Sequence, residues 1–181
     1  MLEVFGLLAK PTLMSLLPLF DLSLIARAAR PALEFEGGDG RRSAFTFGDL
    51  ENRSNRLAHL LRARGTKAGD RVAIQMPNCL AYPIAVFGTL KAGLIMVNTN
   101  PLYTSAEMVH QFSDSGAVGL IVIDLFAPKV AEVLPKTAIK SVVTVKISEF
   151  FPPVVAGVIR LVQRFWNRSL PKITVEHTWF Q

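Results

Sequence analysis

Cysteine is nearly absent from the sequence. The N-terminal part of the chain is strongly apolar but contains no long uncharged stretch. One cysteine, Cys79, can form neither an internal disulfide nor a cysteine-based zinc site. Half of the 181 residues are hydrophobic and 19% are charged. This composition excludes general disorder and supports one domain with a substantial core and flanking arms. The cysteine content is typical of a reducing compartment.

The first 26 residues are strongly apolar, but charged residues and prolines interrupt them. Their longest uncharged run, residues 11–20, is too short to span a bilayer. Positive charge follows the apolar run, whereas a secretory signal carries it in front. We therefore expect residues 1–31 to form an N-terminal arm with a helix that packs on the domain. A helix on a membrane surface and a true membrane anchor are the alternatives.

Positive charge is concentrated near the C-terminus. Residues 1–135 contain 13 Lys and Arg against 12 Asp and Glu, whereas residues 136–181 contain 7 against 2. A basic region attracts nucleic acid, anionic lipid or an acidic partner. No nucleic-acid-binding motif accompanies it, and its neighbours are aliphatic. We therefore expect no nucleic acid, and favour lipid or a partner helix.

Residues 148–181 form this basic C-terminal arm, whose pattern from Val154 onward predicts an amphipathic helix. Cationic and aromatic side chains of this kind are those expected at a lipid interface. The arm could contact a membrane, or it could pack on another part of a larger protein. The candidate membrane contacts are Arg160, Arg164, Phe165, Trp166 and Arg168.

Residues 32–47 predict a small hairpin, with LEFE and SAFTF as strands around a glycine-rich turn. An amphipathic helix follows, with a capping-box spacing at Thr46 and Asp49 and a stop at Gly65. His59 is expected on its solvated face. The glycines of the hairpin precede no Lys-Ser/Thr pair and open no helix, so they indicate a turn and no phosphate loop.

The central block, residues 71–116, alternates short apolar strands with helices. Strands are predicted at residues 71–76, 94–97, 118–123 and 141–145, and a nearly uncharged helix over residues 79–92 is expected to be buried. Thr104 and Glu107 predict a capped helix that ends at Gly116, and Asp124 is a candidate cap for a fourth helix. Strands alternating with helices imply βαβ crossovers and a mainly parallel sheet. The predicted fold class is α/β, with residues 32–147 as the α/β subdomain.

Catalytic patterns are missing from this block. No nucleophile lies beside a base, no carboxylates are paired, and no Gly-rich loop opens a helix after a strand. His110 and Asp114 are four residues apart on one predicted helix, a spacing that usually reflects a surface pair. The residues alone predict a scaffold without a catalytic site.

The order of several short motifs resembles the opening of the AMP-forming acyl-CoA synthetases, relatives of luciferases and of peptide-synthetase adenylation domains. The general motifs are FTFGDL from Phe45, NRLAHLL from Asn55 and GDRV from Gly69. The motifs MPN from Met76, LKAG from Leu90 and VNTNPLYT from Val97, closed by DSGA from Asp114, resemble the long-chain fatty acid–CoA ligase branch. The resemblance covers residues 32–145 and extends more weakly to residue 181.

This resemblance implies a two-step ligation. ATP and a fatty acid give an acyl-adenylate and pyrophosphate, and CoA then displaces AMP to form acyl-CoA. The family uses Mg²⁺, a phosphate loop carrying Lys, and a mobile lid, and no matching motif occurs in these 181 residues. We therefore expect no adenylation by this chain alone. The implied partners are fatty acid, CoA and the remainder of a ligase, in the cytoplasm or peripherally on the inner face of a membrane.

The resemblance also implies a ligand contact in the turn formed by residues 98–104, near the path of the CoA nucleotide. Its candidate residues are Asn98, Asn100, Tyr103 and Thr104. The positive end of the helix capped by Thr104 could face a phosphate there. Alternatively, Asn100 and Thr104 serve only as turn and cap residues. The competing function for the whole chain is a noncatalytic module that binds a membrane or partner through the basic arm.

Overall fold

The computed structural model describes residues 27–36 and 42–146, together with Gly157. The N-terminal helix, the glycine turn of the hairpin and the five candidate membrane contacts lie outside these residues. The regular elements, in chain order, are β1 (Pro31–Glu36), β2 (Arg42–Thr46), α3 (Phe47–Ala63), β3 (Arg71–Gln75), α4 (Ala81–Lys91), β4 (Ile95–Asn98), α5 (Ser105–Ser115), β5 (Gly119–Ile123), α6 (Ala127–Val133) and β6 (Ser141–Val145).

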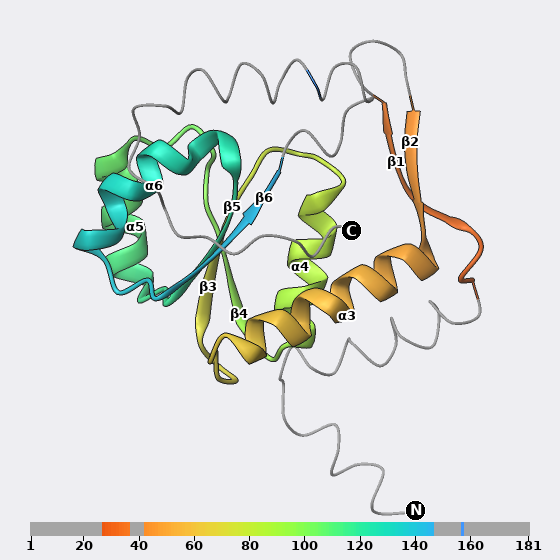
Figure 1. Ribbon diagram of the computed structural model, residues 1–181, viewed down its shortest axis with the longest axis horizontal. Coiled ribbons are helices and arrows are strands. Elements are labelled where there is room, and N and C mark those ends of the chain that lie inside the picture. The colour runs from red at the N-terminus through yellow and green to blue at the C-terminus, as the bar shows by residue number, and fades with distance from the viewer. Residues whose placement is uncertain (1–26, 37–41, 147–156, 158–181) are drawn as a thin grey trace, which may run out of the picture.

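Four strands form one parallel sheet, in the order β4-β3-β5-β6. In β3, Val72 pairs with Met96 of β4 on one side and with Gly119 of β5 on the other. Strands β1 and β2 form a separate antiparallel hairpin beside the N-terminal end of α3 (Figure 1). The predicted α/β class, the parallel sheet and the hairpin are confirmed.

Helices cover both faces of the sheet, with α3 and α4 on one face and α5 and α6 on the other (Figure 1). Alternate residues of β3 supply the two cores, because successive side chains of a strand point to opposite faces. Val72 and Ile74 are fully buried towards α3 and α4, whereas Ala73 is fully buried towards α5 and α6. The carboxyl ends of all four strands therefore meet at one edge, called the carboxyl edge below.

Both predicted capping boxes are present. Thr46 Oγ1 accepts a 3.1 Å hydrogen bond from Asp49 N, and Thr46 N donates a 3.0 Å bond to Asp49 Oδ2. The Thr46 hydroxyl, which donates to Asp49 Oδ2 at 2.7 Å, and then Thr46 N hold the pKa of Asp49 below its usual range, because both bonds favour the charged carboxylate. Helix α3 ends at Ala63, and Gly65 follows in the left-handed region with φ of 86°. His59 is exposed on the solvated face, as expected.

Two predictions about helices need correction. Asp124 lies in a short 3-10 turn, and α6 begins after Phe126 without a side-chain cap. Helix α4 is less completely buried than expected, because Tyr82, Val86 and Phe87, which pack against the same core, are half-buried. Complete burial is confined to the side of the helix that includes Ile84 and Gly88.

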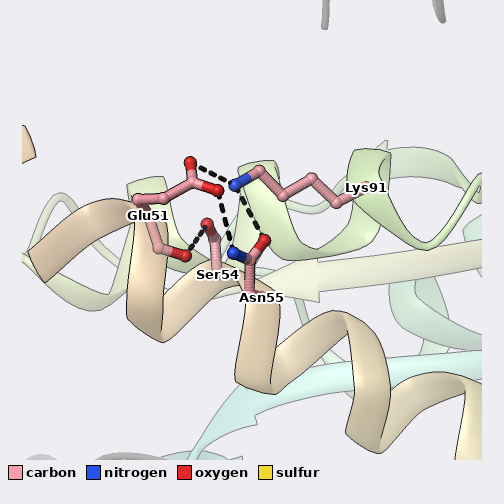
Figure 2. A network of polar contacts seen from close by, with 4 residues as sticks. All are labelled: Glu51, Ser54, Asn55 and Lys91. Carbon is pink, nitrogen blue, oxygen red and sulfur yellow. Dashed lines mark hydrogen bonds and ion pairs between the residues drawn. The ribbon is translucent and has the colours of Figure 1, made fainter. Parts of the chain in front are cut away.

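A polar network joins α3 to α4 (Figure 2). Lys91 Nζ donates to Glu51 Oε2 at 2.5 Å and to Asn55 Oδ1 at 3.0 Å, and Asn55 Nδ2 donates to Glu51 Oε1 at 2.8 Å. Ser54 Oγ donates to the Glu51 carbonyl oxygen at 3.0 Å. The Lys91 side chain is only 10% exposed, so this network lies at a largely buried position between the two helices.

Candidate functional site

The 98–104 turn leaves the sheet at the end of β4, on the carboxyl edge. Its backbone is tied to the neighbouring strand, since Thr99 N donates to the Ile74 carbonyl oxygen at 3.0 Å. Gln75 Nε2 reaches the Asn100 carbonyl oxygen at 3.3 Å. Within the turn, Leu102 N donates to Asn100 Oδ1 at 2.9 Å. The turn is therefore held in one shape by the chain itself.

The four candidate contacts differ in exposure and in hydrogen bonding. Asn98 and Asn100 are exposed, Tyr103 is half-buried against the core under α5, and Thr104 is exposed at the helix start. Lys129 Nζ of α6 donates to the Tyr103 carbonyl oxygen at 3.0 Å. The side chains of Asn98 and Asn100 are thus open to solvent, where a ligand could approach. The backbone of Tyr103 is held by Lys129 of α6.

Thr104 is used as a helix cap. Its Oγ1 accepts a hydrogen bond from Glu107 N at 3.3 Å, and Glu107 Oε2 accepts from Thr104 N at 2.8 Å. The bond from Thr104 N lowers the pKa of Glu107, with a second contribution from the Thr104 hydroxyl. The carboxylate is therefore ionised at neutral pH.

This cap makes the start of α5 a poor phosphate site. The Glu107 carboxylate lies at the positive end of the helix and accepts a hydrogen bond from Thr104 N. Its negative charge also repels a phosphate. The exposed amides of Asn98 and Asn100 carry hydrogen-bond donors and acceptors, of which Asn100 Oδ1 already accepts from Leu102 N.

Gln75 is a polar residue at the carboxyl edge that sequence reasoning missed. It is the last residue of β3 and completely buried, and its Oε1 has no hydrogen-bond partner. Thr99 is 1% exposed, and its Oγ1 likewise has no hydrogen-bond partner. The signal available in the sequence was a glutamine inside the apolar strand segment RVAIQM.

The remaining candidates do not form a site. His110 and Asp114 both lie exposed on α5. Across the described ranges there is no group of three or more His, Cys, Asp or Glu that could hold a metal ion. Described residues therefore provide no set of ligands for Mg²⁺, and none of them matches the phosphate loop that ATP would require. Cys79 is half-buried, and burial raises the pKa of its thiol.

No helix among the described residues is both long and apolar enough to cross a membrane.

A family model described as AMP-binding enzyme matches residues 24–162. A long-chain-fatty-acid–CoA ligase of Escherichia coli O6:H1 is 39% identical over 159 residues, which is 87% of this chain and 28% of that enzyme. The Haemophilus influenzae ligase of the same name is 37% identical over 164 residues, covering 90% of this chain and 28% of its own length. The chain thus spans little more than a quarter of these relatives.

Solved structures agree with this placement. A benzoate CoA ligase from Burkholderia xenovorans superposes with a TM-score of 0.61 at 29% identity, over 71% of this chain and 25% of that one. A long-chain-fatty-acid-CoA ligase from Archaeoglobus fulgidus superposes with a TM-score of 0.64 at 23% identity, over 72% of this chain and 27% of that one. This likeness shows the shared fold. With the family match extending over most of the sequence, the chain belongs to the AMP-binding enzyme family.

Proposed function

We propose that this chain is the N-terminal portion of a long-chain fatty acid–CoA ligase, which converts ATP, fatty acid and CoA into acyl-CoA, AMP and pyrophosphate. The observation that carries the proposal is the 39% identity to a ligase of that name across 87% of the chain. The family assignment and the parallel sheet with its hairpin support it.

The chain acts as scaffold in this proposal, and the adenylation chemistry belongs to the rest of the ligase. ATP and Mg²⁺ bind elsewhere, because the described residues offer neither a phosphate loop nor a cluster of metal ligands. What the chain contributes is the carboxyl edge, held by the sheet and by the capped helix α5. In open α/β sheets ligands bind outside the carboxyl ends of the strands, so this edge faces the reaction site.

At that edge, Asn98, Asn100, Tyr103 and Thr104 are proposed to line the path of CoA. Asn98 and Asn100 would contact neutral polar groups of CoA, such as its amides, whereas Thr104 positions the turn through its bond to Glu107. An Asn98→Ala, Asn100→Ala variant of the complete ligase would then raise the KM for CoA and leave that for fatty acid unchanged. Equal KM values for CoA in parent and variant would exclude the contact.

The test of the function uses ATP–pyrophosphate exchange with a long-chain fatty acid. Purified residues 1–181 are expected to give no exchange above a protein-free control, because the chain holds no triphosphate-binding loop. Exchange is expected when the chain is combined with the complement, defined here as the Escherichia coli ligase without the segment that this chain matches. Robust exchange by the chain alone would contradict the proposed division of labour.

A second candidate function is favoured by the excess of positive charge in residues 136–181. In this alternative the basic arm binds an anionic membrane, or a protein partner, through Arg160, Arg164, Phe165, Trp166 and Arg168. A cytoplasmic chain held peripherally on the inner membrane face would suit an enzyme that takes fatty acids from a bilayer. Both functions can hold for one protein.

Sedimentation with anionic liposomes tests the arm. Each cationic side chain near such a surface contributes about 1 kcal/mol, so reversing three charges should weaken binding by more than about 100-fold. The variant is Arg160→Glu, Arg164→Glu, Arg168→Glu. Arg53→Glu, Arg56→Glu and Arg62→Glu on α3 provide a matched control with the same change in net charge. Equal binding by parent and arm variant would rule out the electrostatic interaction.

A further inference from the structure

Two glutamine side chains hold the short segment of Asn98, Thr99 and Asn100, called the asparagine segment below. Gln75 Nε2, at the end of β3, donates to the Asn100 carbonyl oxygen at 3.3 Å. Gln111 Nε2, on α5, donates to the Asn98 carbonyl oxygen at 3.1 Å. The two bonds come from different elements and end on the two residues that flank Thr99. Those two residues are candidate CoA contacts.

Thr99, in the middle of the asparagine segment, is bound to the sheet. Its N–H donates to the Ile74 carbonyl oxygen at 3.0 Å. Ile74 pairs with Asn98 in the parallel register of β3 and β4, so Gln75 is the next residue of β3 beside Thr99. Because successive side chains of a strand point to opposite faces, Gln75 lies on the same face as Ala73, which is the face covered by α5 and α6. The segment is therefore held by β3 and by α5 together.

Both glutamines carry an oxygen that the fold does not use. Gln75 is completely buried, and its Oε1 has no hydrogen-bond partner among the residues that the structure describes. The Oε1 of Gln111 is also covered and has no partner within the same described ranges. This orientation is required, because a backbone carbonyl oxygen only accepts hydrogen bonds and each amide must turn its nitrogen towards it. A buried polar atom without a partner destabilises the folded chain.

The Asn100 carbonyl oxygen does not depend on Gln75 for a partner. It also accepts a hydrogen bond from Tyr103 N at 3.2 Å, and Asn100 is exposed to solvent. Methionine in place of Gln75 would remove the unpartnered oxygen and leave the carbonyl oxygen its bond from Tyr103. The variant should therefore be as stable as the parent, or more stable. What the glutamine adds is a fixed position for the backbone of Asn100.

We propose that Gln75 and Gln111 are positioning residues, which hold the backbone of the asparagine segment so that the exposed side chains of Asn98 and Asn100 meet CoA in a fixed geometry. This rests on the proposed function. Residues that break a local rule of folding are expected at functional sites, and here two of them converge on three residues. A contact supported in this way loses little conformational freedom when its ligand binds.

Hydrogen exchange of the full chain tests the positioning role without reference to CoA. Two amides report on the segment, because Thr99 N is bound to β3 and Leu102 N donates to Asn100 Oδ1. Both should exchange about 10-fold faster in Gln75→Met, Gln111→Met, since the loss of a hydrogen bond loosens the backbone by about that factor. Amides of β5 should keep their rates. The urea midpoint of the single variant Gln75→Met should equal or exceed that of the parent.

Thr89→Val is the matched control. Thr89 lies in α4, on the opposite face of the sheet. It is completely buried, and its Oγ1 has no partner among the residues that the structure describes. The substitution thus removes an unpartnered buried oxygen, as Gln75→Met does, but should leave exchange at Thr99 and Leu102 unchanged. Faster exchange of these two amides in Thr89→Val would overturn a specific role for the glutamines.

Kinetics of the complete ligase connect the segment to CoA. Gln75→Met, Gln111→Met should raise the KM for CoA about 10-fold and leave the KM for fatty acid unchanged. A purely structural role would alter the amount of active enzyme and leave both KM values as they are. In an Asn98→Ala, Asn100→Ala background the glutamine substitutions should add nothing, because they act through the asparagines. A further rise in the KM for CoA in that background would contradict the proposal.

The remaining outcomes separate the positioning role from the proposed function. Unchanged exchange at Thr99 and Leu102 would overturn the positioning role. So would a KM for CoA that responds to the asparagine substitutions and not to the glutamine substitutions, although the proposed path of CoA would then stand. Faster exchange, with a KM for CoA that neither pair of substitutions changes, would reject the CoA contact and show that the glutamines only hold the backbone.

Discussion

On one face of the sheet, α3 crosses α4 at Gly88 and is joined to it by the Lys91 network. On the other face, α5 and α6 cover a core around Phe112, and an exposed hydrogen bond from Ser105 to Glu132 joins them. The first pair of helices packs so closely that a side chain at Gly88 would collide with Leu57. The second pair positions the loops of the carboxyl edge. The polar contact between the helices is largely buried on the first face and exposed on the second. The following substitutions test that division, beginning with the largest expected effect.

Phe112→Ala removes the largest fully buried side chain, from the core beneath α5. We expect the free energy of unfolding, measured in urea, to fall by about 3–5 kcal/mol, because a cavity replaces an aromatic ring. Leu102→Ala, at a position 82% exposed, should change it by less than about 0.5 kcal/mol. A loss below about 1 kcal/mol for Phe112→Ala would mean that α5 unfolds separately from the sheet.

Gly88→Ala tests the contact between α3 and α4. A Cβ at this position would lie 2.7 Å from Leu57 Cδ2 and 2.8 Å from its Cβ and Cγ. Overpacking of this kind costs about 1–3 kcal/mol, and alanine's better helix propensity offsets about 1 kcal/mol of it. The same assay should therefore show a net loss.

Gly157→Ala is the control for this substitution, because a Cβ there would meet nothing within 4 Å. In a Leu57→Ala background, Gly88→Ala should no longer destabilise the chain, since the opposing side chain is gone. If Gly88→Ala raises stability in the parent background, the close crossing of α3 and α4 is refuted.

Lys91→Met removes the donor at the centre of the network between α3 and α4. The free energy of unfolding should fall by about 1–3 kcal/mol, because Glu51 and Asn55 lose a partner at a largely buried position. Ser105→Ala, which removes the exposed bond to Glu132 between α5 and α6, should cost less than about 0.5 kcal/mol. Similar losses from both substitutions would remove the proposed difference between the two faces.

Thr46→Ala and Thr104→Ala remove equivalent helix caps, one on each face. Each should cost about 1 kcal/mol at neutral pH, because the N–H of Asp49 or Glu107 loses its acceptor. Circular dichroism during urea unfolding measures both. Thr46→Ser, which keeps the hydroxyl, should retain most of the stability, and a full loss in Thr46→Ser would argue against a capping role.

The helix cap at Thr46 also affects how the free energy of unfolding depends on pH. Hydrogen bonds from Thr46 lower the pKa of Asp49, so this carboxylate stabilises the folded chain above its unfolded pKa, and that stability is lost as pH falls below about 4. Thr46→Ala returns the pKa of Asp49 towards its usual value. The variant should therefore lose less stability than the parent between neutral pH and pH 3.

Local signals in the sequence predicted much of this fold. Thr46 with Asp49 and Thr104 with Glu107 marked two helix starts, and Gly116 marked an end, because caps and left-handed glycines depend on neighbouring residues. The strands and their parallel arrangement followed from the alternation of elements.

Features that depend on distant residues escaped prediction. Lys91 bonds to Glu51 across 40 positions, and Gln75 to the Asn100 carbonyl oxygen across 25, which no local pattern indicates. The incomplete burial of α4 was missed because composition does not reveal how much of a helix its neighbours cover. The exposure of Leu102 and Leu125 likewise depends on the folded carboxyl edge.

The central claim is most directly tested by acyl-CoA formation from ATP, a long-chain fatty acid and CoA in the co-purified complex of this chain with the complement. The account predicts no product from either component alone and steady formation of acyl-CoA by the complex. Acyl-CoA produced by residues 1–181 alone, or none from a complex that has co-purified, would contradict it.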